Sequence, residues 1–583
     1  MKKAAFFCWV LVSLAALAAM YHLFFTRELR LYGGKSVPEQ RQEVFRRAGM
    51  PVELLPVVAA VAQEWPLLTR YQSHGDPVRL SYVHYLLAPR VPVAVSDHHL
   101  LLDHDRISFH PANGKKLPVM EHGPAPWAFG LAVLLVAGVA LWIRAWPLQE
   151  RGTFPEAVVL AMFVLTLCAV SARWLFGDAR LGFALFALMG GVGWLLSVRW
   201  SMRGSLPPVA GWSGMLGQWS GRMRRAPVVP LCCLLIAAAS VWAFVMAVVV
   251  VPDDWDAWAI WGAKARVLAL GVGPLSDVTR FGHGDYPLLW PALWGFSGWL
   301  ASGWEEMWSR GWGALFLLLC CRQLFLIVQD ETNDRATGAL AAALFATIPN
   351  VPLIASWSYA EAPLWLCLCA GLGAAFRWRR SGLLRDAAVA GACAAAAAWT
   401  KNEGVLFFLV LALFFLFGKK TGRLRALALY AACMLVLYVP WFVWVRLVQE
   451  MGDHATAGLK MDPHAMSWAL DRVPAAIEAV FRMWQDPRQW SIVGAGLGAA
   501  WLYGMIAAPW GKKVELLLPA LLLAGFFVVI LFHPAEVYWQ VGTSWNRLTV
   551  QTLPFFLVVT IKVFSELMNG YELRSQKRET GNP

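Results

Sequence analysis

The feature that most constrains the fold is an uninterrupted apolar run over residues 228–251, which ends in closely spaced carboxylates. A helix of about 20 apolar residues crosses the hydrocarbon core of a bilayer, so this run predicts a membrane-spanning helix. Asp253, Asp254 and Asp256 follow where the helix leaves the membrane. Because a carboxylate near lipid is costly to ionise without water, a cation or a substrate, this position indicates function. An ordinary polar helix end is the alternative for any single Asp.

Similar apolar runs recur along the 583 residues, of which 58% are hydrophobic and only 15% charged. This composition predicts an all-α polytopic membrane protein in a lipid bilayer. The net charge of +13 does not indicate a nucleic-acid partner, because Lys and Arg lie between the apolar runs rather than on one basic face. Most of the 10 Cys lie inside apolar runs, and their spacing indicates neither disulfides nor a zinc site.

The first 25 residues contain two lysines followed by an apolar run without a small-residue cleavage motif. This pattern favours a signal-anchor helix over residues 1–25 with a cytoplasmic N-terminus. Residues 26–125 are polar and are expected to form a small α+β extracytoplasmic insert. Helical periodicity is found at 39–47 and 52–62, and strand-like runs at 79–87 and 106–109.

The insert also carries a cluster of His and Asp, whose members are His98, His99, Asp103, His104, Asp105 and His110. Such side chains can bind metals, but their spacing matches no recognised ligand pattern. A polar surface turn is therefore the preferred interpretation of this cluster.

The apolar run at 286–302 is short for a crossing and contains Pro287 and Pro291. Counted as a crossing, it would place the basic segment Arg377–Arg380 outside, against the positive-inside rule. We therefore expect a helix that lies in the outer interface or is re-entrant. The inner loops are then short and merely basic.

This assignment gives about 14 transmembrane helices in the whole chain. Extra helices and a basic cytoplasmic loop occupy 126–227, a core occupies 228–566, and a cytoplasmic tail occupies 567–583. Besides 228–251, crossings are expected at 127–146, 156–176, 180–200, 308–328, 336–355, 361–376, 386–400, 403–417, 426–447, 491–508, 514–532 and 548–565. The long loop at 448–490 could cover a cavity and select an acceptor.

The same count places a second polar set on the outer side, beside the Asp cluster. Its main members are Arg310, Tyr359, Glu361, Lys401, Glu403 and Arg547. Lys401 lies between two short apolar segments, which would draw it below the outer surface. A lysine there needs an anion, either a bound ligand or simply Glu361 or Glu403.

In their order along the chain, these residues resemble the GT-C glycosyltransferases. The pattern is an Asp after a membrane helix, a Tyr-Pro interface motif, an Arg at the next helix, Tyr359-Ala360-Glu361 and Thr400-Lys401-Asn402-Glu403-Gly404. It is most similar to the branch related to protein O-mannosyltransferases and the lipid A aminoarabinose transferase, and it covers about 228–566. The resemblance implies a GT-C-type helical core that moves a sugar from a polyprenyl-phosphate donor to an extracytoplasmic acceptor, which is a glycan, lipid or protein.

Carried over by position, the family's catalytic Asp falls best on Asp256, with Asp254 as its competitor. Asp285, before Tyr286-Pro287, resembles the polar or acidic residue that precedes the family's Pro-containing motif. A carboxylate can take the acceptor's proton, and Lys401, Arg310 or Arg547 can hold the phosphate. No metal is required, although clustered Asp residues leave a divalent cation open.

Trp255, Trp258 and Trp261 share one loose helix face, which could stack on a sugar ring or rest among lipid headgroups.

Two other classes of function compete with the transferase. A transporter or flippase for a lipid-linked or anionic solute would also need intramembrane cations, but no internal repeat is visible. An inert scaffold for the insert explains the outward polar residues least well. The expected location is a bacterial inner membrane with the site facing the periplasm or exterior.

Overall fold

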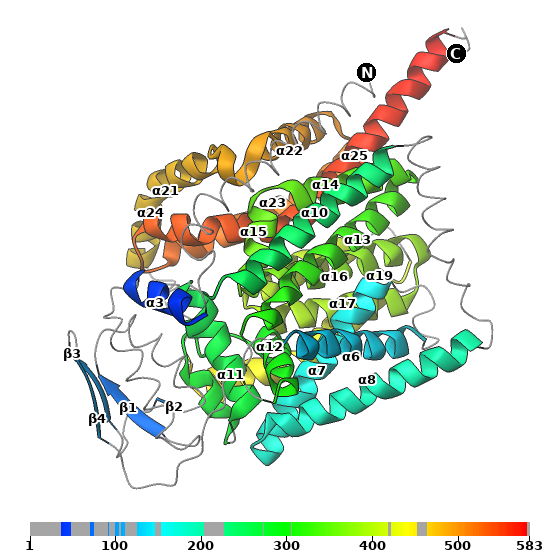
Figure 1. Ribbon diagram of the computed structural model, residues 1–583. Coiled ribbons are helices and arrows are strands. Elements are labelled where there is room, and N and C mark those ends of the chain that lie inside the picture. Colours follow the sequence, from blue (N-terminus) through cyan, green and yellow to red (C-terminus); the bar gives the residue numbers. More distant parts are fainter. Residues whose placement is uncertain are drawn as a thin grey trace.

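The computed structural model describes most of the membrane region and part of the insert. The described residues are 37–47, 70–74, 91–92, 99–103, 106–110, 125–145, 153–202, 227–417 except 253, 272, 303 and 305, 421–451, and 463–579. The predicted signal anchor at 1–25, the helix at 52–62 and the strand at 79–87 lie outside these residues. Within them, the chain forms a bundle of helices with a small sheet at one side (Figure 1).

Seven helices in the described part of the chain are long and apolar enough to cross a membrane. They include α6 (Pro126–Ala145), α7 (Phe154–Phe176), α8 (Ala179–Met202), α10 (Val228–Val249), α13 (Trp312–Thr332) with η5 (Trp308–Gly311), α23 (Trp510–Phe532) and α25 (Asn546–Glu579). α25 continues without a break past residue 566, where a separate tail was expected. These helices support the prediction of a helical membrane protein.

Two bent pairs bring the count of crossings to as many as nine within the described residues. α14 (Arg335–Thr347) and α15 (Asn350–Ser356) meet at 63°, and α19 (Arg423–Leu437) meets α20 (Val439–Val443) and η6 (Trp444–Val448) at 43°. Further helices are α16 (Glu361–Ser381), α17 (Leu384–Thr400), α18 (Glu403–Leu416) and α22 (Pro487–Ala507). The count of fourteen crossings stays a prediction.

The described part of the insert combines a helix and a sheet. α3 (Val37–Arg47) covers the helix predicted at 39–47, and β4 (Arg106–His110) covers the strand predicted at 106–109. The sheet has the order β2-β1-β3-β4, with β1 (Arg70–His74) parallel to both β2 (Val91–Pro92) and β3 (His99–Asp103), and β3 antiparallel to β4. This register pairs His99 with His110, two members of the histidine-rich cluster.

The segment expected to lie in the outer interface or to be re-entrant is covered by protein, so an interface position is not observed and the re-entrant alternative stays a prediction. α12 (Leu289–Leu300) has only 12 residues and does not pass as a crossing, but its residues from Leu289 to Gly298 are all buried. It packs against α6, α7 and α11 (Ala263–Leu270). Its Trp290 and Trp294 are therefore core residues rather than headgroup anchors, because neighbouring helices cover them on every side.

The long loop expected at 448–490 contains a 22-residue helix, α21 (Pro463–Trp484), which lies against α23 and α24 (Val537–Gln540). Arg472 of α21 stacks over Trp468 at 4.1 Å and donates hydrogen bonds to the carbonyls of His533 and Ala535, each at 2.6 Å. These bonds fix the turn that leads into α24. The described part of this segment is thus mainly a helix that packs on the bundle, and its role in covering a cavity and selecting an acceptor stays a prediction.

The end of the bundle that was expected to be merely basic carries a network of ion pairs. Glu156 at the start of α7 is fully buried and accepts hydrogen bonds from Arg377 and Gln323. Five further acids at this end, Asp330, Glu331, Asp386, Glu515 and Glu566, pair with Arg377, Arg379, Arg380, Lys512 and Lys562. Much of the positive charge counted for topology is therefore balanced by acids that clamp helix ends together.

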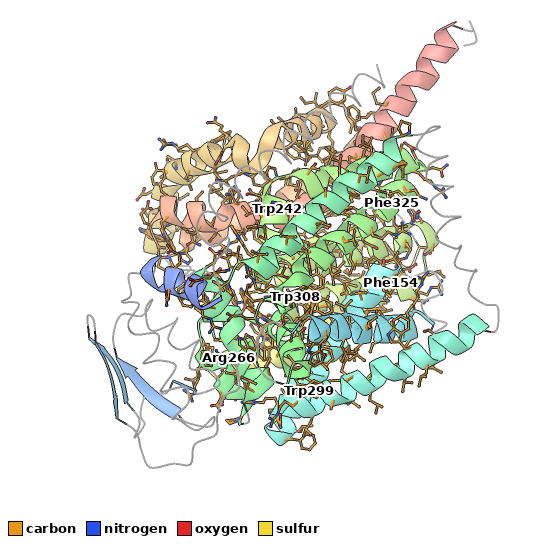
Figure 2. All side chains as sticks on the ribbon, in the orientation of Figure 1. Phe154, Trp242, Arg266, Trp299, Trp308 and Phe325 are labelled. Atoms are coloured by element: carbon orange, nitrogen blue, oxygen red, sulfur yellow. The ribbon has the colours of Figure 1, made fainter. Side chains whose placement is uncertain are left out.

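Side chains fill the spaces between the helices (Figure 2). Phe244 of α10 packs edge-on against Trp308 of η5 with ring centroids 5.7 Å apart, and Phe129 of α6 packs against Trp312 at 5.6 Å. These aromatic contacts hold α6, α10 and the start of α13 together. They lie next to the end of α10, where the predicted site begins.

Candidate functional site

Six elements place their polar ends at one end of the bundle. These are the end of α10, the start of η5, the end of α15, the start of α16, the α17–α18 turn, and the start of α25. Arg310 joins two of them, because its guanidinium donates to the carbonyls of Val250 and Ser356, the second at 3.1 Å. Arg310 is only 4% exposed. These backbone bonds hold the ends of α10 and α15 together, and the phosphate contact expected of Arg310 stays a prediction.

Asp256 and Arg547 form the central ion pair of this region, although 291 positions separate them in the sequence. The Asp256 side chain is 24% exposed and that of Arg547 is 14% exposed, so the pair borders solvent. Arg547 also lies 3.7 Å from Glu361 and 4.9 Å above the ring of Tyr359. Four of the residues predicted for the site thus meet around one guanidinium.

Lys401 is held between two carboxylates. Its Nζ lies 2.9 Å from Glu361 and 2.8 Å from Glu403. Each acid begins a helix and Lys401 ends α17, so all three charges are also favoured by the helix dipoles. Burial lowers the pKa of Lys401, but the two carboxylates outweigh it and raise this pKa above its usual value. The alternative in which Lys401 pairs with protein acids is therefore the observed one.

Asp285 lies in the loop before α12 and belongs to a neighbouring group that contacts the α17–α18 turn. Its Oδ2 accepts a hydrogen bond from Asn402 at 2.6 Å and lies 3.2 Å from Arg446. Asn402 stands between Lys401 and Glu403, so the α17–α18 turn connects this group with the Asp256 group. Asp285 is 2% exposed, which makes it less accessible to a substrate than Asp256.

A buried lysine shapes the loop that carries Asp285. Lys264 of α11 is fully buried and donates to the carbonyls of His283 at 2.5 Å and Tyr286 at 3.3 Å. His283 adopts a left-handed backbone conformation with φ of 49°, which this clamp helps to hold. Burial, only partly opposed by Asp285, lowers the pKa of Lys264 to about 7.

An aromatic wall, formed by Trp255, His283, Tyr286 and Trp261, runs beside Asp256. The rings of Trp261 and Tyr286 stack at 5.4 Å, those of His283 and Tyr286 at 4.7 Å, and Trp255 meets His283 edge-on at 5.9 Å. Trp258 and Trp261 are only 3% and 1% exposed. The expectation of three Trp on one open face is therefore wrong, and Trp255, His283 and Tyr286 are the partly exposed members.

Three π-helices carry or adjoin the charged residues of the site. Asp256 opens η3 (Asp256–Gly262), Arg446 lies within η6, and Arg547 comes two residues after η7 (Val541–Trp545). π-helices are rare and concentrate at functional sites, because the wider turn redirects side chains. This local geometry brings the acid and its cation together, and it also explains why the Trp spacing expected for an α-helix failed.

The electrostatics favour an ionised Asp256. Burial raises its pKa, but the charges of Arg547 and Lys401 outweigh that effect and hold the pKa below its usual value. The charge of His283 adds to this lowering, and its ring meets that of Trp255, the residue before Asp256, edge-on at 5.9 Å. Burial and then the charge of Asp254 raise the pKa of Tyr359, so its phenol stays protonated near neutrality. Asp253 lies outside the described residues.

Sequence reasoning missed four residues that the fold adds to the site: Lys264, His283, Asn402 and Arg446. Arg446 had a usable signal, because an Arg inside an apolar run is itself unusual. Asn402 stood in the Thr400–Gly404 stretch quoted for the family pattern but had no assigned role. Among the described residues, no group of three or more His, Cys, Asp or Glu is arranged to hold a metal ion.

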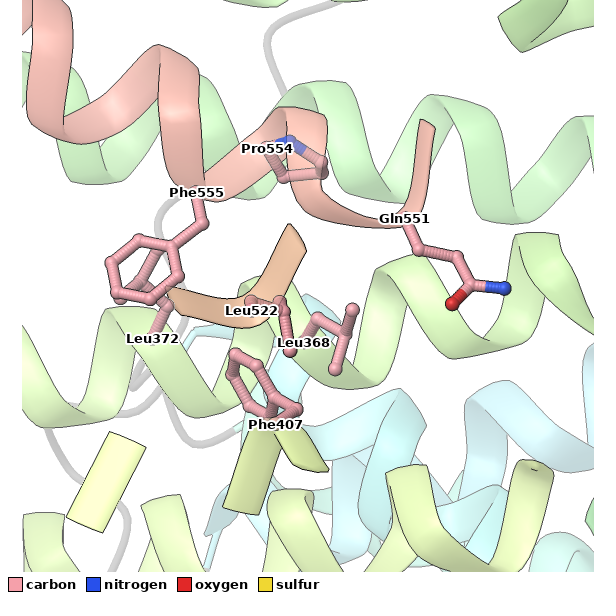
Figure 3. A pocket seen from close by; sticks show the side chains of 7 residues that line it. All are labelled: Leu368, Leu372, Phe407, Leu522, Gln551, Pro554 and Phe555. Atoms are coloured by element: carbon pink, nitrogen blue, oxygen red, sulfur yellow. The ribbon is translucent and has the colours of Figure 1, made fainter. Parts of the chain in front are cut away.

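A separate apolar hollow lies within the helix packing (Figure 3). Its lining residues are Leu368, Leu372, Phe407, Leu522, Gln551, Pro554 and Phe555. None of them belongs to the polar groups described above, so this hollow is distinct from the candidate site.

Compared with known proteins, the chain matches no protein-family model, no curated protein and no solved structure.

Proposed function

We propose that the chain is a membrane glycosyltransferase of GT-C type that moves a sugar from a polyprenyl-phosphate donor to a hydroxyl-bearing acceptor. The observation that carries this proposal is the ion pair of Asp256 and Arg547 at the solvent border, next to an aromatic wall. Such a site combines a base, a cation for phosphate and rings that can stack on a sugar. These are the three elements that the reaction requires.

In the proposed step, Asp256 removes the proton from the acceptor hydroxyl. The acceptor oxygen then bonds to the anomeric carbon, while the bond from that carbon to the phosphate oxygen breaks. The leaving polyprenyl phosphate keeps the electron pair, and Arg547 stabilises its charge through bidentate contact. Attack from the face opposite the phosphate inverts the anomeric configuration.

The resting pair of Asp256 and Arg547 then has a chemical purpose. A donor phosphate competes with the carboxylate for the same guanidinium, so its binding releases Asp256 to face the acceptor. Lys401 is neutralised by Glu361 and Glu403 at 2.9 and 2.8 Å, so its role is to hold that turn. This assigns the phosphate contact to Arg547 ahead of Lys401 and Arg310.

The proposal places the site outside the cytoplasm, most simply at the periplasmic face of a bacterial inner membrane. With about 14 crossings, the polar ends of α10, α16 and α18 share that face, and so does the insert at 26–125. The opposite end, with its paired Arg and Lys residues, then faces the cytoplasm.

The decisive experiment uses the full chain purified in detergent with a panel of polyprenyl-phosphate sugars and envelope extracts as acceptor. Donor consumption is measured for wild type, for Asp256→Asn, and for the matched variant Asp254→Asn. We expect consumption to fall by roughly 100-fold or more in Asp256→Asn, as for loss of a general base, with much less effect in Asp254→Asn. Retained thermal unfolding temperatures control for folding.

Equal turnover by wild type and Asp256→Asn would reject Asp256 as the base. A larger loss in Asp254→Asn would transfer that role to Asp254. Donor that binds but is never consumed by wild type would instead favour the alternative function, a transporter or flippase for a lipid-linked or anionic solute.

A further inference from the structure

The insert reaches the site through α3, whose Gln40 bonds to the backbone at the end of α10. Gln40 is 4% exposed. Its Nε2 donates to the carbonyl of Val249 at 2.9 Å, and its Oε1 accepts from the amide of Val251 at 3.0 Å. One side chain therefore satisfies a donor and an acceptor where the membrane helix stops and its own bonds end.

The backbone between these two bonds is fixed as well. The amide of Val250 donates to the carbonyl of Met246 at 3.2 Å, and the carbonyl of Val250 accepts from Arg310. Val250 itself is extended, with φ of −103° and ψ of 129°. The direction in which the chain leaves α10 is thus determined by Gln40 from one side and Arg310 from the other.

A second anchor holds α3 in place independently of Gln40. Nη2 and Nε of Arg41 lie 2.9 and 3.2 Å from Oε1 of Glu306, whose side chain is 5% exposed. Val44, four residues after Gln40 and therefore on the same helix face, is 3% exposed and packs into the main core. α3 lies beside the end of α10 and above α11 in Figure 1.

Val251, whose amide is bonded to Gln40, lies just before the acids in the sequence. Pro252 follows it, and because the φ of proline is fixed, the direction of the chain at Val251 also determines where Asp254 and Asp256, the first residue of η3, lie. A shift of the chain at Val251 would move Asp256 relative to Arg547, which is anchored on α25.

We propose that α3 of the insert is a positioning element for the acid-bearing segment, with Gln40 setting the exit of the chain from α10. The insert is then a structural part of the site rather than a separate appended domain. This inference does not depend on any particular chemistry at Asp256.

Hydrogen–deuterium exchange of the full chain in detergent tests the proposal without an activity assay. The test variant is Gln40→Met, which keeps the side-chain length but loses both bonds. The matched control is Gln42→Met, an exposed glutamine on the same helix. We expect peptides covering 250–262 to exchange roughly fivefold to tenfold faster in Gln40→Met, in line with loss of about 1 kcal/mol of local protection, and to be unchanged in Gln42→Met.

A charge swap provides a second readout. Arg41→Glu should release α3 and speed exchange at both 37–47 and 250–262, and adding Glu306→Arg should restore protection at both. Unchanged exchange at 250–262 in Gln40→Met would overturn the proposal. So would a release of α3 by Arg41→Glu that leaves 250–262 as protected as in wild type.

Discussion

At the scale of single residues, the site is a set of charges that neutralise one another in a poorly solvated place. Asp256 pairs with Arg547, Asp285 with Arg446, and Lys401 with two acids. Burying an unpaired charge costs several kcal/mol, so each cation needs its acid even without a ligand. In the proposed transferase, a donor phosphate would therefore have to replace a carboxylate rather than occupy an empty cationic pocket.

The first residue-scale prediction concerns the pH dependence of the proposed sugar transfer. A base works above its own pKa, and Arg547 holds the pKa of Asp256 below its usual value. Arg547→Gln removes that cation, so the pKa of Asp256 should rise and the acidic limb of the pH–rate profile should move to higher pH. Arg547→Lys keeps the charge and should move the limb less. A limb that stays in place in Arg547→Gln would show that the two groups are not coupled.

The second residue-scale prediction concerns Lys264 and stability. Its pKa in the folded protein is lowered to about 7, below the unfolded value of about 10.4, so between these pH values the unfolded chain binds the extra proton. Stability must then rise with pH in this window. The thermal unfolding temperature of wild type relative to Lys264→Met should increase from pH 7 to pH 9. A difference that is independent of pH would contradict the buried, easily deprotonated lysine.

At the scale of elements, close helix contacts and buried clamps decide how the ends are aligned. α6 and α8 approach so closely that a Cβ at Gly193 would lie 2.1 Å from the carbonyl oxygen of Gly138. Small residues permit such contacts between membrane helices, where packing replaces the hydrophobic effect as the driving force. At the start of α7, Glu156 ties this helix to α16 through Arg377.

Two neighbouring glycines of α8 test this close approach. Gly193→Ala should lower stability by about 1–3 kcal/mol, because backbone atoms of α6 would have to move. A Cβ at Gly191 meets nothing within 4 Å, so Gly191→Ala should be neutral or gain up to about 1 kcal/mol from helix propensity. Unfolding in detergent measures both variants. Equal effects would mean that the helices are farther apart than described.

The clamp on α7 makes a separate prediction. Glu156→Gln leaves Asp386, at 3.4 Å, as the only carboxylate partner of Arg377 among the described residues. The free energy of unfolding should fall by roughly 3 kcal/mol, the lower end of the range for breaking a buried ion pair. Glu478 forms an exposed pair with Arg482, with side chains 48% and 70% exposed, so Glu478→Gln should cost less than about 1 kcal/mol. Unfolding temperatures in detergent rank the two, and a Glu156→Gln variant as stable as wild type would refute the clamp.

At the scale of the whole molecule, the arrangement depends on which end faces the cytoplasm. The proposed orientation predicts that a cysteine introduced at exposed Gln42 of α3 reacts with a membrane-impermeant maleimide in intact cells. A cysteine at Ser575, near the end of α25, should react only after the membrane is opened. Labelling of wild type supplies the background from its own Cys residues. The reverse pattern would invert the topology and move the site to the cytoplasmic side.

The sequence by itself determined the class of the protein and the end of the bundle where the polar residues gather. The length of an apolar run can be read from the sequence locally, so α6, α7, α8, α10 and α13 begin and end close to their predicted limits. The same reasoning placed Asp256, Glu361, Lys401 and Arg547 on one side.

Only the tertiary structure decided which charges pair and what covers each segment. Asp256 opens one π-helix, and Arg547 closely follows another. The wider turns of these helices let the two side chains meet, and π-helices leave no recognisable sequence pattern. α12 is buried because neighbouring helices enclose it, which its own composition could not reveal. Gln40 meets α10 across 209 positions of chain. Contacts between distant segments depend on packing of the whole bundle, and no local pattern encodes them.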